Sequence, residues 1–467
     1  MSTGTVDSTV EGFVPGWVRQ YLRDHAIHVV VVVLLVAYPF LYDVLVGMFA
    51  LTAETLLPRP RTMVMVLVLG LFAMSFDFIS GYTGYLSFGH AAFFGIGAYF
   101  VVLGYNGQLP LLPAELPFMP LMLLGALAAA AVAFLVGLIS FRLTGVYFAM
   151  ITLGISEILF VISEHWNYLT PGNSDPTEGV PAGSPAAGVE SFQPQIGVPF
   201  VDALQVETGI FGDDTLFGLD FEALGLLPFG EVNSAVVVSY FAIGAVVLVC
   251  YLTMQRIIHS PFGRVMIAIR ENEQRAKAIG YNTLKYKMSA FMISAFFGGI
   301  AGGLLVAWQG VVDPDNTFFF LVTGFALIAT IIGGIRTLAG PFFGYIFIES
   351  VEEFLSREGS GGGLQPYLEA ILPGNVLKTD IAGLTVNEAL DQFMTGHGEF
   401  YLGIIFVIFV LYIPIGILGT LRLRLGANSV AGSLSRKLRR SDETDEKSDT
   451  GTDGPEDGPT TDPATED

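Results

Sequence analysis

The sequence predicts an all-α polytopic membrane protein with about ten transmembrane helices and with both termini in the cytoplasm. Three observations lead to this fold class. The composition is 52% hydrophobic and only 14% charged, long apolar stretches recur along the 467 residues, and Lys and Arg gather in a few of the intervening segments. A soluble protein carries about 25% charged residues, so an ordinary soluble enzyme is excluded.

The membrane spans follow from the lengths of the apolar stretches, because a helix needs about 20 apolar residues to cross a bilayer. The clear candidates are 62–80, 86–105, 117–140, 143–163, 235–254, 288–308, 317–334 and 400–420. Two weaker candidates are 27–51, which contains Pro39 and Asp43, and 338–355, which carries three glutamates. We therefore expect helices 1–5 within 27–165, helix 6 at 235–254, helices 7–9 within 288–355 and helix 10 at 400–420.

The basic residues predict the orientation, because Lys and Arg of short loops collect on the cytoplasmic side. Segment 255–287 carries seven of them and 421–467 begins with a basic flank, so both should be cytoplasmic, as should 1–26. No Lys or Arg occurs in 166–234, which holds ten acids and should lie outside. The first residues show no cleavable signal peptide pattern. Ten spans satisfy these assignments.

The segments outside the membrane differ in composition. Residues 166–234 are rich in Pro, Gly and acids and form either a small external cap or a solvated loop. The external loop 356–399 starts with a glycine run, and a short helix is expected near 383–394. The tail from Ser441 has the composition of a disordered segment.

The net charge of −21 is concentrated in two of these segments. Residues 166–234 contribute ten acids and no base, and residues 441–467 contribute eleven acids and one base. Each segment therefore carries −10, and the rest of the chain is close to neutral. Acidic aqueous segments help proteins to stay hydrated in concentrated salt, so we expect a halophilic source.

No catalytic or metal motif is present in the sequence. It contains no Walker A phosphate loop, no HExxH, no GxSxG and no paired cysteines. Cys250 is the single cysteine, and the six histidines are scattered. We therefore expect neither a catalytic residue nor a metal site in this chain.

A glycine-rich stretch, residues 81–99, is the first candidate functional segment. Its glycines weaken helix continuity between two apolar segments, and freed backbone groups at membrane depth are tolerated where they line a cavity. The residues expected along a translocation path are Gly81, Tyr82, Thr83, Gly84, Ser87, Gly89 and His90. The spacing is equally typical of closely packed helices, and both interpretations stay open.

Two carboxylates lie within predicted spans, where a charge is costly. Asp77 lies near the cytoplasmic end of its span and is expected to be hydrated there. Glu157 lies deeper, so it must be protonated, paired or facing water, and it is either a further path residue that binds an ammonium group or a structural residue. Gly298, Gly299, Gly302 and Gly303 are expected to support close helix crossing rather than to line a pore.

The basic segment 260–287 is the second candidate functional segment. Pro261 can open a helix with an apolar stripe of Val265, Met266 and Ile269, and Gly280 can end a second short helix after 273–279. Two short amphipathic helices at the membrane face would form a docking surface. A cytoplasmic loop without a partner is the alternative.

Three motifs together resemble a known family. Residues 81–99 (GYTGYLSFGHAAFFGIGAY), the loop SPFGRVMIAIRENEQRAKAIG at 260–280 and GGIRTLAGPFFG at 333–344 are similar to the membrane permease of branched-chain amino acid ABC importers, and most of all to its M-type subunit. The resemblance covers most of residues 62–355 in the same order. It implies the ABC importer permease fold.

The resemblance also implies how the chain works. The cytoplasmic loop would be the element that couples to the ATPase, a role carried by Arg264, Arg270, Glu271, Asn272, Glu273, Ala276 and Gly280. The implied partners are a second, H-type permease subunit, two ATPase subunits that bind ATP and Mg, an extracellular solute-binding protein, the amino acid solute and the lipid bilayer. No cofactor in this chain and no nucleic acid partner are expected.

Alternatives to this function differ in solute or in energy source. Permeases with these motifs also serve urea, short amides and other amino acids. An ion-coupled secondary transporter would use Glu157 and Asp77 as ion or proton sites without an ATPase. The long connection 166–234 and the acidic tail are departures from the family pattern.

Overall fold

The structure is a computed structural model of the full chain. It describes residues 35, 37–39, 41–42, 58–105, 109, 116–143, 145–165, 211–212, 215–216, 219–220, 234–309, 312, 314–356, 380–381, 384–385, 398–413 and 415–420. The helices and strands discussed below lie within these ranges.

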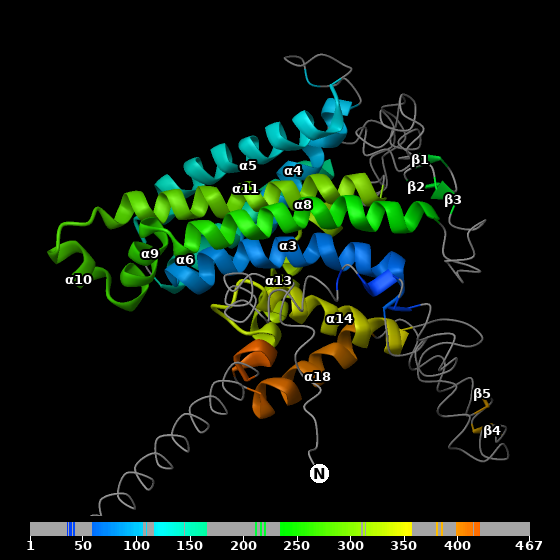
Figure 1. The fold of residues 1–467 in the computed structure, drawn as a ribbon. Helices are drawn as coiled ribbons and strands as arrows, with labels where there is room; N and C mark the ends of the chain where they lie inside the picture. Colours follow the sequence, from blue (N-terminus) through cyan, green and yellow to red (C-terminus); the bar gives the residue numbers. More distant parts are fainter. Residues whose placement is uncertain are drawn as a thin grey trace, which may run out of the picture. The chain divides into compact units, whose positions relative to one another are not determined.

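The described part of the chain is built mainly from α-helices (Figure 1). The first four are α3 (Pro60–Thr83), α4 (His90–Tyr105), α5 (Phe118–Ser140) and α6 (Val146–His165). The next are α8 (Ser234–His259), α9 (Pro261–Glu271), α10 (Glu273–Ala278) and α11 (Thr283–Gln309). They are followed by α12 (Pro314–Thr317), α13 (Phe320–Gly333), α14 (Gly340–Ser356) and α18 (Gly398–Tyr412).

The helices confirm the all-α polytopic fold class. Each clear apolar stretch of the sequence coincides with a helix, and the weaker stretch 338–355 coincides with α14. Within the described residues, seven helical stretches are long and apolar enough to cross a membrane. They are Pro60–Thr83, Phe118–Ser140, Val146–Glu164, Ser239–His259, Thr283–Gln309, Pro314–Gly333 and Leu402–Thr420. The predicted span 27–51 lies almost entirely outside the described residues.

Short antiparallel strands occur in the two connecting segments. In 166–234, the strands β1 (Phe211–Gly212), β2 (Thr215–Leu216) and β3 (Leu219–Asp220) form a sheet in the order β1-β2-β3. In 356–399, β4 (Asp380–Ile381) pairs with β5 (Leu384–Thr385), with Asp380 opposite Thr385. The short helix expected near 383–394 is therefore wrong at its start, where a hairpin forms instead, and residues 386–394 lie outside the described residues.

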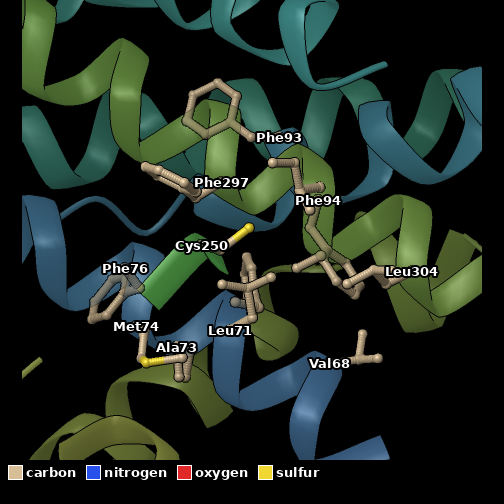
Figure 2. Packing of buried hydrophobic residues seen from close by; sticks show 14 of the residues in the cluster. Val68, Leu71, Ala73, Met74, Phe76, Phe93, Phe94, Cys250, Phe297 and Leu304 are labelled. Atoms are coloured by element: carbon tan, nitrogen blue, oxygen red, sulfur yellow. The ribbon is translucent and has the colours of Figure 1, made fainter. Parts of the chain in front are cut away.

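Helices α3 and α11 form the centre of the packing. Both are apolar on all sides, and 83% of the α3 span and 78% of the α11 span are buried. Helix α11 packs against α3, α4 and α5, and α3 also packs against α8 and α14. Figure 2 shows side chains from α3, α4, α8 and α11 together, among them Phe76, Phe93, Cys250 and Phe297. Every face of the two central helices therefore meets protein.

Glycines permit the close approach of α4 and α11. A Cβ atom at Gly302 would collide with the backbone carbonyl of Phe94, and one at Gly97 with that of Gly299. A Cβ atom at Gly298 would instead lie 3.4 Å from the nearest atom, His90 Nε2, which is an ordinary contact. Close backbone contact between membrane helices depends on such small residues. The structural role expected for the α11 glycines thus rests on Gly302 more than on Gly298.

The outer helices expose large apolar side chains. Only 28% of the α6 and α8 spans is buried. Exposed side chains of α5 and α6 include Leu127, Leu135, Val146, Tyr147 and Met150. Apolar faces of this extent are stable in a lipid bilayer or against another membrane protein. The chain is accordingly a multi-pass integral membrane protein.

Candidate functional site

Helices α9 and α10 have strong local signals for their ends. Ser260 is the N-cap of α9 and accepts a hydrogen bond from the Gly263 amide, and Pro261 occupies the first helical position. Asn272 lies in extended conformation between the two helices, and its Oδ1 accepts a hydrogen bond from the Arg275 amide, 2.9 Å away. Gly280, with φ of +93°, follows α10. These are the helix boundaries that the sequence predicted.

The face of α9–α10 that packs against α11 is apolar. Val265 and Ile269 of α9 are buried together with Ala276 of α10, and Tyr286 of α11 packs against them. The predicted stripe of α9 is therefore correct. Ala276 lies inside this cluster rather than on the surface, so it holds α9 and α10 together and is not free to touch another protein.

The opposite face of the helix pair is exposed. Of the residues assigned to ATPase coupling, Arg264, Glu271, Asn272 and Gly280 are exposed. The exposed apolar side chains Ile279, Tyr281 and Leu284 lie next to them in the chain. These three residues lie outside the apolar stripe that the sequence predicted for α9, and no sequence signal singled them out. Apolar residues at the tip of a basic segment are typical of protein docking surfaces.

Residues 84–89 form a break between α3 and α4. Gly84 ends α3 in the left-handed conformation, φ +79°, and its amide donates a hydrogen bond to the Ser80 carbonyl. Helix α4 starts at His90, four residues later than the predicted span. The Ala91 amide in the first turn of α4 donates to Thr323 Oγ1 of α13, 2.8 Å away. The predicted interruption is present.

The polar residues of the break are mostly buried by the chain itself. Gly81, Tyr82, Thr83, Ser87, Gly89 and His90 are all buried, and only Gly84 is exposed. Tyr82 donates to the Arg336 carbonyl and Thr83 to the Ile79 carbonyl. A Cβ atom at Gly89 would collide with the Thr152 carbonyl of α6. The close-packing interpretation therefore describes this segment well. The close approach of Gly89 to Thr152 also brings the break into contact with α6.

His90 belongs to a buried polar cluster between α3, α4 and α11. Its Nε2 lies 2.9 Å from Ser75 Oγ and 3.5 Å from Ser294 Oγ. The Ser75 hydroxyl donates to the Phe72 carbonyl, so Nε2 carries the ring proton and donates to Ser75. The rings of Phe72, Phe76 and Phe93 surround the imidazole. Nδ1 has no hydrogen-bond partner within the described residues.

Asp77 is fully buried, and the hydration expected for it is wrong. The carboxylate accepts a hydrogen bond from the Arg336 amide, 3.2 Å from Oδ1. Arg336 has φ of +72° in the connection between α13 and α14. The connection covers the end of α3, which excludes water from a position that its place in the sequence would expose. Asp77 therefore has a structural role, which is to hold a strained loop against α3.

Replacing Asp77 is expected to loosen this loop. Asp77→Asn keeps the Oδ1 acceptor, whereas Asp77→Ala leaves the Arg336 amide without it. Losing the acceptor of this partly buried hydrogen bond costs up to about 1–3 kcal/mol, so Asp77→Ala should lower the free energy of unfolding in detergent micelles by more than Asp77→Asn. Equal stability of the two variants would show that the hydrogen bond contributes nothing.

Arg270 connects α9 to the end of α3. Its side chain is 15% exposed. Nη1 donates to the Gly81 carbonyl, 2.7 Å away, and Nη2 to Glu271 Oε1, 2.6 Å away. A Cβ atom at Gly84 would lie 2.9 Å from Arg270 Cγ. The guanidinium thus satisfies a carbonyl at the helix C-terminus, where a positive charge is stabilising.

Glu273 connects α10 to the break and to α11. Its Oε1 is 2.8 Å from Lys287 Nζ and 2.9 Å from Lys277 Nζ, and it accepts from Thr283 Oγ1. Its Oε2 accepts from the Tyr85 hydroxyl, 3.0 Å away. Lys287 Nζ donates to Tyr85 Oη, 2.6 Å away, and lies 4.5 Å from the centre of that ring. Tyr85, Glu273, Lys277, Thr283 and Lys287 are called the Glu273 network below.

The Glu273 network is charged at neutral pH. Burial raises the pKa of Glu273, but the hydrogen bonds from Lys287, Lys277 and Tyr85 outweigh it and lower the pKa from 4.5 to about 2. A carboxylate with a lowered pKa stabilises the folded state fully above its ordinary pKa, and this stabilisation is lost as the pH falls through the lowered value. The Glu273 carboxylate therefore keeps its full stabilising effect from neutral pH down to about 4.5.

Glu157 lies on α6. It is partly buried, and its Oε2 is buried without a hydrogen-bond partner among the described residues. The neighbouring Ser156 donates to the Phe318 carbonyl, and Thr152 to the Ala149 carbonyl. The structure thus brings the residues of 81–90 together, and two contacts join them to α6, the helix that carries Glu157: Gly89 lies against the Thr152 carbonyl, and the Tyr85 ring lies against that of Phe148.

Sequence reasoning missed Tyr85 and Lys287. Tyr85 lies within the glycine-rich stretch 81–99 but was not among the residues expected along the path, and Lys287 was counted only as one of the seven basic residues of 255–287. Their partner is Glu273, which lies 188 residues beyond Tyr85 in the chain. A sequence pattern such as helical periodicity relates only residues that are close in the chain, so it does not pair Tyr85 with Glu273. The available signal was Lys287 itself, a charged residue directly before the apolar span 288–308.

The chain is similar to known transport proteins. A sequence profile of the family described as "Branched-chain amino acid transport system / permease component" matches residues 60–377. The Escherichia coli protein named "High-affinity branched-chain amino acid transport system permease protein LivM" is 30% identical over 313 residues, which are 66% of this chain and 62% of that protein. Its Salmonella typhimurium counterpart is 30% identical over 58% of this chain and 57% of that protein.

A protein named as a LivH permease is also similar to this chain. A Methanocaldococcus jannaschii protein named "Probable branched-chain amino acid transport permease protein LivH" is 28% identical over 33% of this chain and 46% of that protein. The chain spans 62% and 57% of the length of the two LivM relatives. No solved structure matches the chain. The matched range contains both the break and the helix pair α9–α10.

Proposed function

Because the chain belongs to the family of branched-chain amino acid transport system permease components, we propose that it is the permease subunit of an ATP-binding cassette importer. It would form the translocation path for branched-chain, hydrophobic amino acids in the plasma membrane. The observation that carries this proposal is the family match over residues 60–377. That range includes the break and the helix pair α9–α10, which are joined by the hydrogen bonds of Arg270 and Glu273.

ATP hydrolysis takes place on other chains in this proposal. The sequence has no phosphate loop, so ATP and Mg would bind to two separate ATPase subunits. The exposed face of α9–α10 supports a docking role, because it combines the charged residues Arg264 and Glu271 with exposed Ile279. In this assignment Arg264, Glu271, Asn272 and Gly280 face the ATPase.

The remaining partners follow from the same proposal. The similarity to a protein named as a LivH permease supports pairing with a second, H-type permease subunit. The exposed apolar side chains of α5 and α6 suit lipid or such a subunit. An extracellular solute-binding protein would deliver the amino acid, and residues 166–234 are placed on its side by their lack of basic residues.

The translocation path is proposed to run along the break and α6, which pack against each other and would form one wall of it. Gly84 is the exposed residue of the break, and Gly81, Tyr82, Thr83, Ser87, Gly89 and His90 would form the wall behind it. Glu157 would supply an acidic group for the ammonium of the solute, since its Oε2 has no protein partner within the described residues. Urea, short amides and other amino acids are alternative solutes.

The subunit composition of the purified protein tests this proposal. We expect the full-length tagged chain, extracted from its native membrane in mild detergent, to purify with a second permease chain and with two copies of a Walker A protein. Native mass spectrometry would measure the stoichiometry, and ATP hydrolysis by the purified complex would show that the Walker A protein is active. A chain that purifies without any nucleotide-binding protein would favour an ion-coupled transporter.

A further inference from the structure

Two contacts connect the helix pair α9–α10 to the break, and they lie on either side of Asn272. Arg270, the penultimate residue of α9, binds the Gly81 carbonyl just before the break. Glu273, the first residue of α10, binds Tyr85 within the break. The side chains of Arg270 and Glu273 therefore contact other parts of this chain. Glu271 and Asn272, which lie between them in the sequence, are exposed. The junction of α9 and α10 is therefore attached to residues 81–85, at the start of the break.

We infer that Arg270 and the Glu273 network transmit movement of α9–α10 to the break, so that a displacement of the docking helices moves residues 84–89. This inference rests on the proposed function and assigns Arg270, Glu273, Tyr85 and Lys287 as positioning residues for transport. Different residues of α9–α10 therefore have different roles in this inference. The exposed residues contact the ATPase, whereas Arg270 and Glu273 contact the break and move it.

The energetics of Lys287 make the connection stiff. Its side chain is 5% exposed, and its ammonium group is held by Glu273 and Tyr85. If α10 moved alone, a buried charge would lose its partner, which is among the costliest events in a folded protein. Charge-assisted hydrogen bonds are also short and directional. Tyr85 therefore follows Glu273 more readily than it separates from it.

The Tyr85 ring extends the connection toward α6. Its ring centre lies 5.4 Å from that of Phe141 and 5.2 Å from that of Phe148, both in edge-on geometry. Phe148 lies in the first turn of α6, the helix that carries Glu157. A shift of Tyr85 would therefore press on the helix that borders the proposed path. The Tyr85 hydroxyl thus binds Glu273 of α10, and the Tyr85 ring packs against Phe141 and Phe148, at the end of α5 and the start of α6.

Tyr85→Phe is the most selective test of this inference. It keeps the ring and its contacts with Phe141 and Phe148, but it removes the hydroxyl between Lys287 and Glu273. Lys287→Met removes the charge as well, and Lys287→Arg restores a charge. Lys285→Met is the matched control, because it removes a Lys of the same helix that is exposed and is outside the Glu273 network.

The readout is the number of L-leucine molecules taken up per ATP hydrolysed by the complete complex in proteoliposomes. We expect this ratio to fall at least about fivefold in Lys287→Met, within the usual range of coupling between sites, and to fall less in Tyr85→Phe. Lys287→Arg should recover part of the ratio, and Lys285→Met should keep the wild-type value. A wild-type ratio in Tyr85→Phe and Lys287→Met, or an equal fall in Lys285→Met, would overturn the inference.

A second readout does not depend on the solute. In a Cys250→Ser background without other cysteines, Leu86→Cys places a thiol in the break. We expect vanadate trapping with ATP to change its labelling rate by a water-soluble maleimide, and Tyr85→Phe to reduce that change while ATP hydrolysis continues. If trapping changes the labelling rate in Tyr85→Phe as much as in the wild-type chain, the inference is wrong. A chain that forms no complex with an ATPase would instead refute the proposed function.

Discussion

Gly302→Ala is expected to prevent correct packing of α4 against α11. The added Cβ would meet the backbone carbonyl of Phe94, which no side-chain rotation can relieve. Overpacking of a core costs about 1–3 kcal/mol and sometimes more, and a collision with backbone belongs at the upper end. The free energy of unfolding in detergent micelles should fall by that amount, and less folded protein should reach the membrane.

Gly298→Ala is the matched control for this prediction. It adds the same methyl group one turn earlier on α11, where the nearest atom would be 3.4 Å away. Alanine is the better helix former by about 1 kcal/mol, so this variant should be as stable as the wild-type protein or slightly more stable. If Gly302→Ala and Gly298→Ala had the same stability, the close crossing of α4 and α11 would be refuted.

Gly280→Val is expected to uncouple ATP hydrolysis from uptake without blocking membrane insertion. Gly280 follows α10 with φ of +93°, and a Cβ there would touch no other residue. The penalty is therefore in the backbone, and left-handed conformations cost an L-residue about 1–2 kcal/mol. This corresponds to a roughly 5- to 30-fold shift of the local equilibrium and should reduce uptake per ATP by a similar factor.

Gly280→Asn separates conformation from side-chain volume. Asparagine adopts positive φ more readily than other residues, so this variant should retain most of the coupling. Parallel measurement of ATP hydrolysis and uptake by the two variants checks the prediction. Equal loss in both would mean that any side chain at this position interferes with docking, and that the turn itself is unimportant.

The helices were predictable because their signals are local. Apolar length predicted the spans from 62–80 to 400–420, and Pro261 and Gly280 predicted the boundaries of the cytoplasmic helix pair. Asn272 had been assigned to coupling, and the structure adds that it caps α10. Each of these signals is contained in one continuous stretch of the chain, from a few residues for a helix boundary to about 20 for a span, which is why the sequence was sufficient.

The contacts of the candidate site were not predictable from such stretches. Asp77 was expected to be hydrated because it lies near the end of a span, and only the fold reveals that the Arg336 loop covers it. Tyr85 gains its importance from Glu273 and Lys287, which come from two other helices. The inward direction of Arg270 follows from the position of Gly81, 189 residues earlier.

ATP-dependent uptake in proteoliposomes tests the central claim most directly. The complete complex, with its solute-binding protein added outside, is reconstituted with ATP enclosed and with radiolabelled L-leucine outside. We predict uptake that requires enclosed ATP, that stops with a non-hydrolysable analogue and that a proton gradient cannot replace. Uptake by this chain alone, driven by a proton gradient in the absence of ATP, would contradict its assignment as an ABC importer permease.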